Sequence, residues 1–158
     1  MAVLTDPLFL LFSLGADRYA LPVAEVAVVL PLSPCKQLPG APPWVAGLLP
    51  YEGRHVPVID LSQRTLGRPA AQRVSTRLVL VHDRSPAGEP ALLGLILEQA
   101  TDTLRCAEQH FVRATVAHDE TPYLGPVMPY QGGLLQRVQV SALLDAATRA
   151  VLYAREDA

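Results

Sequence analysis

The chain has 158 residues, of which 50% are hydrophobic and 18% are charged. This length and composition suit one ordinary domain, or two small subdomains that share a core, and they exclude a disordered polypeptide. The formal net charge is −2, from 13 Lys and Arg against 15 Asp and Glu, so the chain lacks the positive field typical of nucleic-acid-binding proteins.

The number of cysteines and the first apolar run indicate the cellular compartment of the protein. The two cysteines, Cys35 and Cys106, are too few for a disulfide framework and favour a reducing cytoplasm. The run Leu8–Leu14 is too short to span a membrane and lacks the basic flank of a signal peptide. We therefore expect a soluble, cytoplasmic protein with no direct membrane insertion.

The N-terminus predicts a β-hairpin. Residues 8–14 and 19–30 are apolar runs, and the second is interrupted at Pro22. Residues 15–18, Gly-Ala-Asp-Arg, predict the turn that joins them.

The middle of the chain predicts short elements. Residues 41–46 begin with two prolines within their first three positions and predict a single helical turn. Residues 56–61 predict another strand. Residues 61–66 predict a short helix that ends at Gly67.

The C-terminal half predicts two strands and the longest helix. Residues 78–81 and 92–97 are apolar runs of strand length, and residues 83–90 predict the loop between them. Residues 141–152 repeat apolar positions at helical spacing, with Ser141 as the expected N-cap.

Together these elements indicate a mainly β protein. Fifteen prolines leave little room for long helices. A parallel α/β sheet is disfavoured, because no helical stretches of the usual length alternate with the strands.

The sequence contains no recognisable pattern for catalysis or for a metal. A Gly-rich phosphate loop, H-E-x-x-H, G-x-S-x-G and paired C-x-x-C patterns are all missing. Cys106, His110 and His118 have a metal-like spacing but lack a fourth ligand. Cys35 and His55 offer a nucleophile and a base that nothing places together. We predict no catalytic residue, cofactor or metal; the enzyme alternative is a small hydrolase that uses Cys35 or Cys106.

Two carboxylates, Asp60 and Glu98, stand at the ends of apolar runs. A carboxylate pair serves general acid–base catalysis only where both groups lie in one cleft. We interpret these two as strand-end groups that accept hydrogen bonds from loop backbone, and the whole chain as a binding module.

Several segments match, in order, the motifs of one family. Residues 9–21 are similar to an opening hairpin, residues 38–47 to a "P-x-A-P-x-x-V-x-G" turn, and residues 53–61 to an "R-G-x-x-x-P-V-x-D-L" run. The later matches are residues 94–98 to "G-x-x-V-D", residues 123–125 to a closing Gly, and residues 140–144 to "L-x-D-x-x-x-L-L". Each motif alone is weak, but the ordered set resembles the CheW family of chemotaxis coupling proteins.

The resemblance implies a fold and an absence of catalysis. The fold would be two small SH3-like five-stranded β-barrels that share a hydrophobic core, with short helices and a C-terminal helix. Residues 1–158 would form a single CheW-like domain made of two β-barrel subdomains. Such proteins have no enzymatic activity and no cofactor.

The resemblance also implies partners. Such adaptors bridge the cytoplasmic tip of a methyl-accepting chemoreceptor and the regulatory domain of a CheA-type histidine kinase, and they are recruited to membrane-associated receptor arrays. Residues 18–21, 43–47 and 75–81 look like adaptors of Wsp-type surface-sensing systems, whose output is cyclic-di-GMP. The alternative is an orphan CheW-like module that self-associates or caps receptor arrays without activating kinase.

The chain departs from the family pattern at two positions. Val28 stands where the family carries an acidic residue, and Glu52 stands where it carries Arg, which reverses a charge and removes a forked donor. Gly53 permits a turn conformation closed to other residues. We predict that partners contact Val26, Val28, Val29, Glu52 and Gly53.

Three points stay open at this stage. The two departures could reflect drift shared with the partners. Val28 is either exposed in a docking patch or part of the core. Trp44, the only Trp, either packs against the core or lies at an interface.

Overall fold

The computed structural model describes residues 5–113 and 121–154. Its strands are β1 (Leu8–Leu14), β2 (Asp17–Pro22), β3 (Val26–Pro31), β4 (Val45–Tyr51), β5 (Arg54–Asp60), β6 (Arg77–Arg84), β7 (Pro90–Arg105), β8 (Leu124–Tyr130) and β9 (Gly133–Val138). Its helices are α1 (Leu61–Leu66) and α2 (Ala146–Ala154), with the single 3-10 turns η1 (Val23–Glu25), η2 (Glu108–His110) and η3 (Val140–Ala142). Among these residues no helix is both long and apolar enough to cross a membrane.

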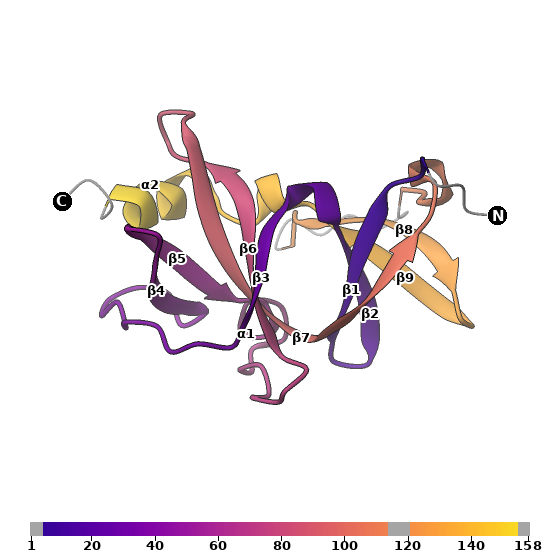
Figure 1. Cartoon of the computed structure of the whole chain (residues 1–158), viewed down its shortest axis with the longest axis horizontal. Coiled ribbons are helices and arrows are strands. Elements are labelled where there is room, and N and C mark those ends of the chain that lie inside the picture. Colours follow the sequence, from indigo (N-terminus) through magenta and orange to yellow (C-terminus); the bar gives the residue numbers. More distant parts are fainter. Residues whose placement is uncertain (1–4, 114–120, 155–158) are drawn as a thin grey trace.

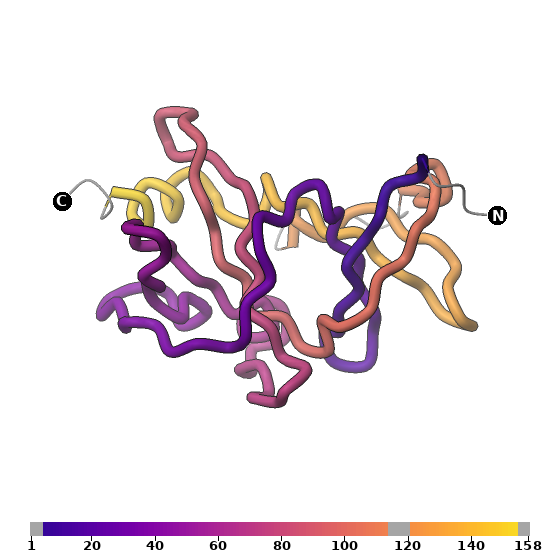
Figure 2. The backbone as a smooth tube through the Cα atoms, viewed as in Figure 1, coloured from indigo at the N-terminus to yellow at the C-terminus, as the bar shows by residue number. Residues whose placement is uncertain are grey.

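The strands form two five-stranded barrels that share β7. The first barrel, on the right of Figure 1, contains β1, β2, β8, β9 and the second half of β7. The second barrel, on the left, contains β3, β4, β5, β6 and the first half of β7. Residues 90–97 of β7 pair with β6 and in part with β5, and residues 98–105 pair with β1. Figure 2 shows β7 passing from one barrel to the other. The predicted mainly β, two-barrel architecture is confirmed.

Each barrel is closed by one bridge from the segment that follows a strand. After β3, the backbones of Lys36 and Leu48 exchange hydrogen bonds of 2.9 and 2.8 Å. After β7, Val112 and Val127 do the same at 2.7 and 2.8 Å. Gly47 is required beside the first bridge, because a Cβ atom there would overlap the carbonyl oxygen of Lys36. The bridges join the ends of each strand order and so complete the barrels.

Three clusters of buried side chains fill the molecule: one inside each barrel, and a larger one between them, which we call the shared core. β1 contributes to two of the three. Phe9 and Leu11 point into the first barrel, whereas Leu10 and Phe12 point into the shared core. A strand buried on both faces has no polar face, so its sequence is an uninterrupted run of apolar residues. The shared hydrophobic core is confirmed.

α1 begins and ends as predicted. Asp60 caps its start and also accepts a hydrogen bond from the backbone N–H of Ala70 at 2.9 Å, and Gly67 ends it in the left-handed conformation. Glu98 accepts from the backbone N–H of Ala71 at 3.0 Å. Both carboxylates therefore accept hydrogen bonds from loop backbone, as the sequence predicted, but only Asp60 ends a strand, because β7 continues past Glu98 to Arg105.

α2 starts later than predicted. Ser141 lies inside the 3-10 turn Val140–Ala142, so it is not the N-cap. The helix begins at Ala146, and the Asp145 carboxylate caps it by accepting the Thr148 backbone N–H at 2.7 Å. This hydrogen bond lowers the pKa of Asp145. Asp and Ser cap helices about equally well, and the chain uses the second of the two available caps.

Other elements differ from the sequence prediction in extent. The apolar run 92–97 predicted only part of β7, which has 16 residues. β4, β8 and β9 were not predicted: prolines and glycines interrupt β4 and β8, and β9 is a short strand that contains the polar residues Gln136 and Arg137. Residues 41–46 contain a turn, closed by a hydrogen bond from Val45 to Pro42 at 3.0 Å, but no helix.

α2 follows the first barrel in sequence but is anchored to the second. Arg149 Nη1 lies 2.6 Å from Asp83 Oδ2, and their side chains are only 15% and 5% exposed. The Tyr153 hydroxyl donates to the same carboxylate at 2.8 Å. Arg149 also donates to the carbonyl of Arg84 at 2.9 Å. The ion pair is thus buried and supported by further hydrogen bonds.

Removing the cation from this anchor should destabilise the protein. Arg149→Met keeps most of the side-chain volume but leaves the buried Asp83 carboxylate unpaired, so we expect a loss of about 3–5 kcal/mol of unfolding free energy. Urea denaturation measures it. The matched control is Asp102→Asn, which breaks a 3.4 Å pair with Arg18 whose acid is 71% exposed, and should cost about 0.5 kcal/mol or less. Equal effects of the two substitutions would contradict the anchor.

Candidate functional site

Three of the predicted contact residues lie on β3. Along this strand half-buried and exposed residues alternate. Val26 packs against the shared core and Val28 against the interior of the second barrel, so Val28 is partly core and not a fully exposed patch residue. Val29 is 44% exposed. Of the three, Val29 offers the most surface to a partner.

The other two predicted residues form the tip of the β4–β5 hairpin. Glu52 has a φ of +48° and Gly53 a φ of +78°. Two successive positive φ angles are those of a type I′ turn, which suits the twist of a hairpin. The Glu52 side chain is exposed at this tip. Gly53 thus has the conformation expected of it.

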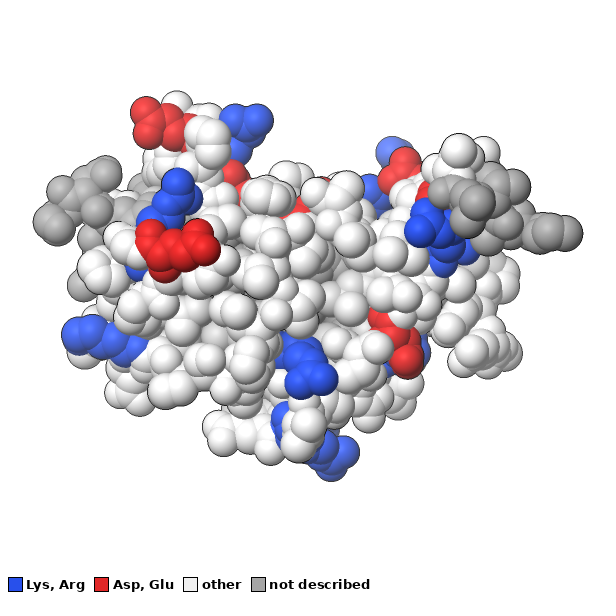
Figure 3. Space-filling model, viewed as in Figure 1, with Lys and Arg blue, Asp and Glu red and all other residues white. Residues whose placement is uncertain are grey.

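The structure does not bring the five predicted residues together. The β4–β5 turn lies near α2 at the end of the second barrel, whereas β3 crosses the middle of the molecule (Figure 1). In Figure 3 the surface over the middle of β3 is free of charge, and the charged side chains lie towards the ends and the upper and lower edges. The predicted contacts are therefore two separate surfaces: an uncharged one on β3 and an acidic tip.

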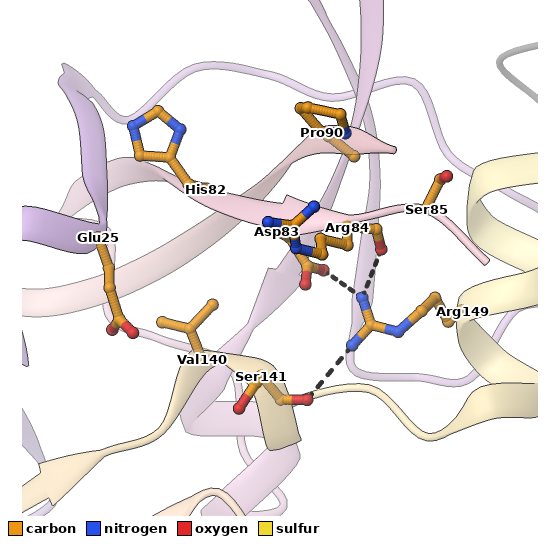
Figure 4. A pocket seen from close by; sticks show the side chains of 10 residues that line it. Glu25, His82, Asp83, Arg84, Ser85, Pro90, Val140, Ser141 and Arg149 are labelled. Atoms are coloured by element: carbon orange, nitrogen blue, oxygen red, sulfur yellow. Dashed lines mark hydrogen bonds and ion pairs between the residues drawn. The ribbon is translucent and has the colours of Figure 1, made fainter. Parts of the chain in front are cut away.

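Sequence reasoning missed a cleft of about 480 Å³ between η1, η3, α2 and the β6–β7 hairpin, which we call the inter-barrel cleft (Figure 4). The Asp83–Arg149 pair lies on one side of it and Glu25 on the other. Burial raises the pKa of Glu25; the nearby Arg137 opposes this shift and Glu108 adds to it. The only sequence signal was a lone acid between Pro22 and an apolar run.

Trp44 packs against the rest of the protein. It is half-buried against the shared core. The Arg64 guanidinium of α1 lies 4.4 Å from the centre of the Trp44 ring and 5.4 Å from that of Tyr123. Cation–π contacts of this kind hold a loop, a helix and the other barrel together. The packing alternative for Trp44 is confirmed.

The candidate nucleophiles and ligands are not assembled into a site. Across residues 5–113 and 121–154, no group of three His, Cys, Asp or Glu side chains is placed to hold a metal. His118 lies outside the described residues. The Cys35 thiol donates to the carbonyl of Ser33, and the Cys106 thiol contacts the sulfur of Met128 at 3.9 Å. Burial raises the pKa of both thiols.

Comparisons with known proteins agree with this geometry. The sequence pattern of the CheW-like domain family matches residues 8–148. Protein PilI of Pseudomonas aeruginosa is 29% identical over 128 residues, which are 81% of this chain and 66% of PilI. The chemotaxis protein CheW of Bacillus subtilis is 24% identical over 144 residues, which are 89% of this chain and 88% of that protein.

A solved structure shares the fold. The crystal structure of the scaffolding protein TtCheW from Thermoanaerobacter tengcongensis matches with a TM-score of 0.78 over 89% of each chain, at 18% identity. The likeness extends to its two SH3-like barrels, so the SH3-like class expected from the sequence is confirmed.

Thiol chemistry tests the cysteine-enzyme alternative. A raised pKa leaves less thiolate at pH 7, and the thiolate is the reactive form. We expect both cysteines of the native protein to react more slowly with Ellman's reagent than in the urea-unfolded chain, where their ordinary pKa returns. Absorbance at a fixed pH follows the reaction. A native thiol that reacts faster than the unfolded chain would support a cysteine nucleophile.

Proposed function

The chain belongs to the CheW-like domain family of non-catalytic scaffold and adaptor proteins, and we propose that it couples a chemoreceptor to a histidine kinase. In this proposal the cytoplasmic tip of a methyl-accepting receptor and the regulatory domain of a CheA-type kinase bind different surfaces of the two barrels. The barrels act as one domain. The protein works in the cytoplasm, at membrane-associated receptor arrays.

The uncharged surface on β3 carries the proposal. β3 stands at the end of the strand order, and among the described strands it pairs only with β6. Its outward residues include Ala27, Val29 and Pro31, all exposed. An apolar surface beside a strand edge suits the docking of another protein, because it offers both area to bury and backbone groups to pair.

The acidic tip at Glu52 supports a partner matched to this chain. Its position corresponds to the Arg of the family pattern, and the side chain is exposed on a rigid two-residue turn. An exposed charge at a rim changes association rate and partner choice more than it changes affinity. We therefore propose a dedicated receptor or kinase, in a surface-sensing pathway whose output is cyclic-di-GMP.

One observation favours the second candidate, an orphan module that self-associates or caps arrays without activating kinase. The edge of β3 that faces away from β6 has no strand partner among the described residues. Strand edges of this kind can pair with a second copy. Sedimentation of the purified chain and a kinase-coupling assay separate the two candidates. The adaptor should sediment as a monomer and stimulate the kinase. The orphan module should self-associate or leave the kinase unstimulated.

A charge on the β3 surface should block docking. Val29→Lys places an ammonium on an exposed position, so the fold is kept while burial against a partner becomes unfavourable. We expect affinity for the receptor tip or the kinase domain to fall about tenfold or more, measured by calorimetry. The control is Val151→Lys on α2, at a residue that is 56% exposed, and it should bind as the unmodified chain does. Unchanged affinity of Val29→Lys for both partners would contradict the role of the β3 surface in docking.

Reversing the charge at the hairpin tip should weaken binding in a salt-dependent way. We expect Glu52→Arg to lower affinity for one of the two partners about five- to tenfold at low salt and less at high salt, because an exposed charge is screened. The control is Asp17→Arg, at the exposed β1–β2 turn. Calorimetric titration at two ionic strengths measures both. Affinities for both partners that match those of the unmodified chain at low salt would refute the role of Glu52.

A further inference from the structure

The inter-barrel cleft contains one acid, Glu25, that forms no ion pair with any residue that the structure describes. Arg149 is paired with Asp83 at 2.6 Å. Arg137, which reaches towards Glu25 from the first barrel, is paired with Glu108 at 3.0 Å. Both arginines thus form ion pairs with other carboxylates, although the Nε atom of Arg137 is also buried without a hydrogen-bond partner.

The remaining polar groups of the cleft also leave Glu25 without a partner. The Oε2 atom of Glu25 is buried and has no hydrogen-bond donor. Arg84 donates to the carbonyl of Gly88 at 3.0 Å, and no bond joins Glu25 to His82, which stands on the same side of the cleft in Figure 4. An unpaired buried carboxylate oxygen costs free energy, and a donor bound beside Glu25 would lower that cost.

We propose that the inter-barrel cleft binds the guanidinium or ammonium group of an Arg or Lys side chain projecting from a partner protein, with Glu25 as its acceptor. This inference rests on the proposed function, because the side chain belongs to one of the two partners. Val140 and Pro90 in the cleft wall offer apolar surface for the aliphatic stem. The Ser141 residue beside Val140 offers further acceptors for the N–H groups.

Charge and size both favour a protein side chain as the occupant. A cation pairs with the Glu25 carboxylate, whereas an anion would meet the same negative charge at short range. The cleft is open to solvent and lies where η1, η3 and the β6–β7 hairpin meet, so a side chain enters it from a docked surface. Burying a charge-assisted hydrogen bond there gives specificity that the uncharged β3 surface does not supply.

Glu25→Gln separates binding from stability. It keeps the shape of the side chain and removes the charge that burial disfavours, so the free energy of unfolding should stay the same or rise. Affinity for the partner that inserts the basic side chain should fall about 10- to 100-fold. The control is Asp17→Asn, which removes one exposed negative charge from the β1–β2 turn and should change neither quantity.

Two measurements decide the outcome. Urea denaturation and calorimetric titration with the receptor tip and the kinase domain are run on the unmodified chain and both variants. A loss of stability in Glu25→Gln would show that Glu25 is structural, and unchanged affinity for both partners would overturn the site.

A third measurement separates this site from the proposed function. Agmatine, a free guanidinium amine, is titrated while the Glu25 carboxyl carbon is followed by NMR, and we expect a saturable shift. Should the unmodified chain bind neither protein, the proposed function fails while the agmatine titration still judges the cleft. No shift at Glu25 would then overturn the inference as well.

Discussion

One strand, β7, pairs with β1 in the first barrel and with β5 and β6 in the second. The relative position of the barrels therefore depends on how β7 turns between them. The turn is at Gln99, whose φ of +50° is rare for a residue other than glycine. Ser13 donates to the Gln99 side chain at 2.9 Å, and Arg18 donates to both Ser13 and the Gln99 carbonyl. The β1–β7 register shifts between Leu11 and Ser13, at this same place. Three side chains thus hold the backbone where it changes barrels.

The turn at Gln99 allows the two barrels to pack against each other through β1 and β6, and the shared core lies between them. β1 and β6 both lie between a barrel interior and the shared core. In β6, Leu78 and Leu80 point into the second barrel, while Val79 and Val81 point into the shared core. Burial on both faces removes the alternation of polar and apolar residues. These strands were therefore the easiest to predict from the sequence. An apolar run does not show, however, which two clusters of buried side chains its two faces contact.

Prediction from sequence failed where tertiary pairing, and not local preference, sets the structure. The second half of β7 carries Gln99, Asp102 and other exposed polar residues, so it has no strand signal, yet β1 pairs with it along its length. At the site, turn chemistry predicted the conformation at Gly53. Glu25 could not be found, because its raised pKa comes from burial and from Glu108, against the opposing effect of Arg137, and both residues are distant in sequence.

The chain crosses between the barrels three times: through η1, through β7, and through η3 into α2. The last crossing is fastened by the buried Asp83–Arg149 pair, so the barrels are joined by a shared strand, a shared core and a helix strap. Two of the crossings, η1 and η3, also form walls of the inter-barrel cleft. A group bound beside Glu25 therefore touches the connections between the barrels directly, whereas β3 and the Glu52 tip belong to the second barrel alone. In these proposals, charged recognition is divided between the joint at Glu25 and the Glu52 tip, and apolar recognition lies on β3.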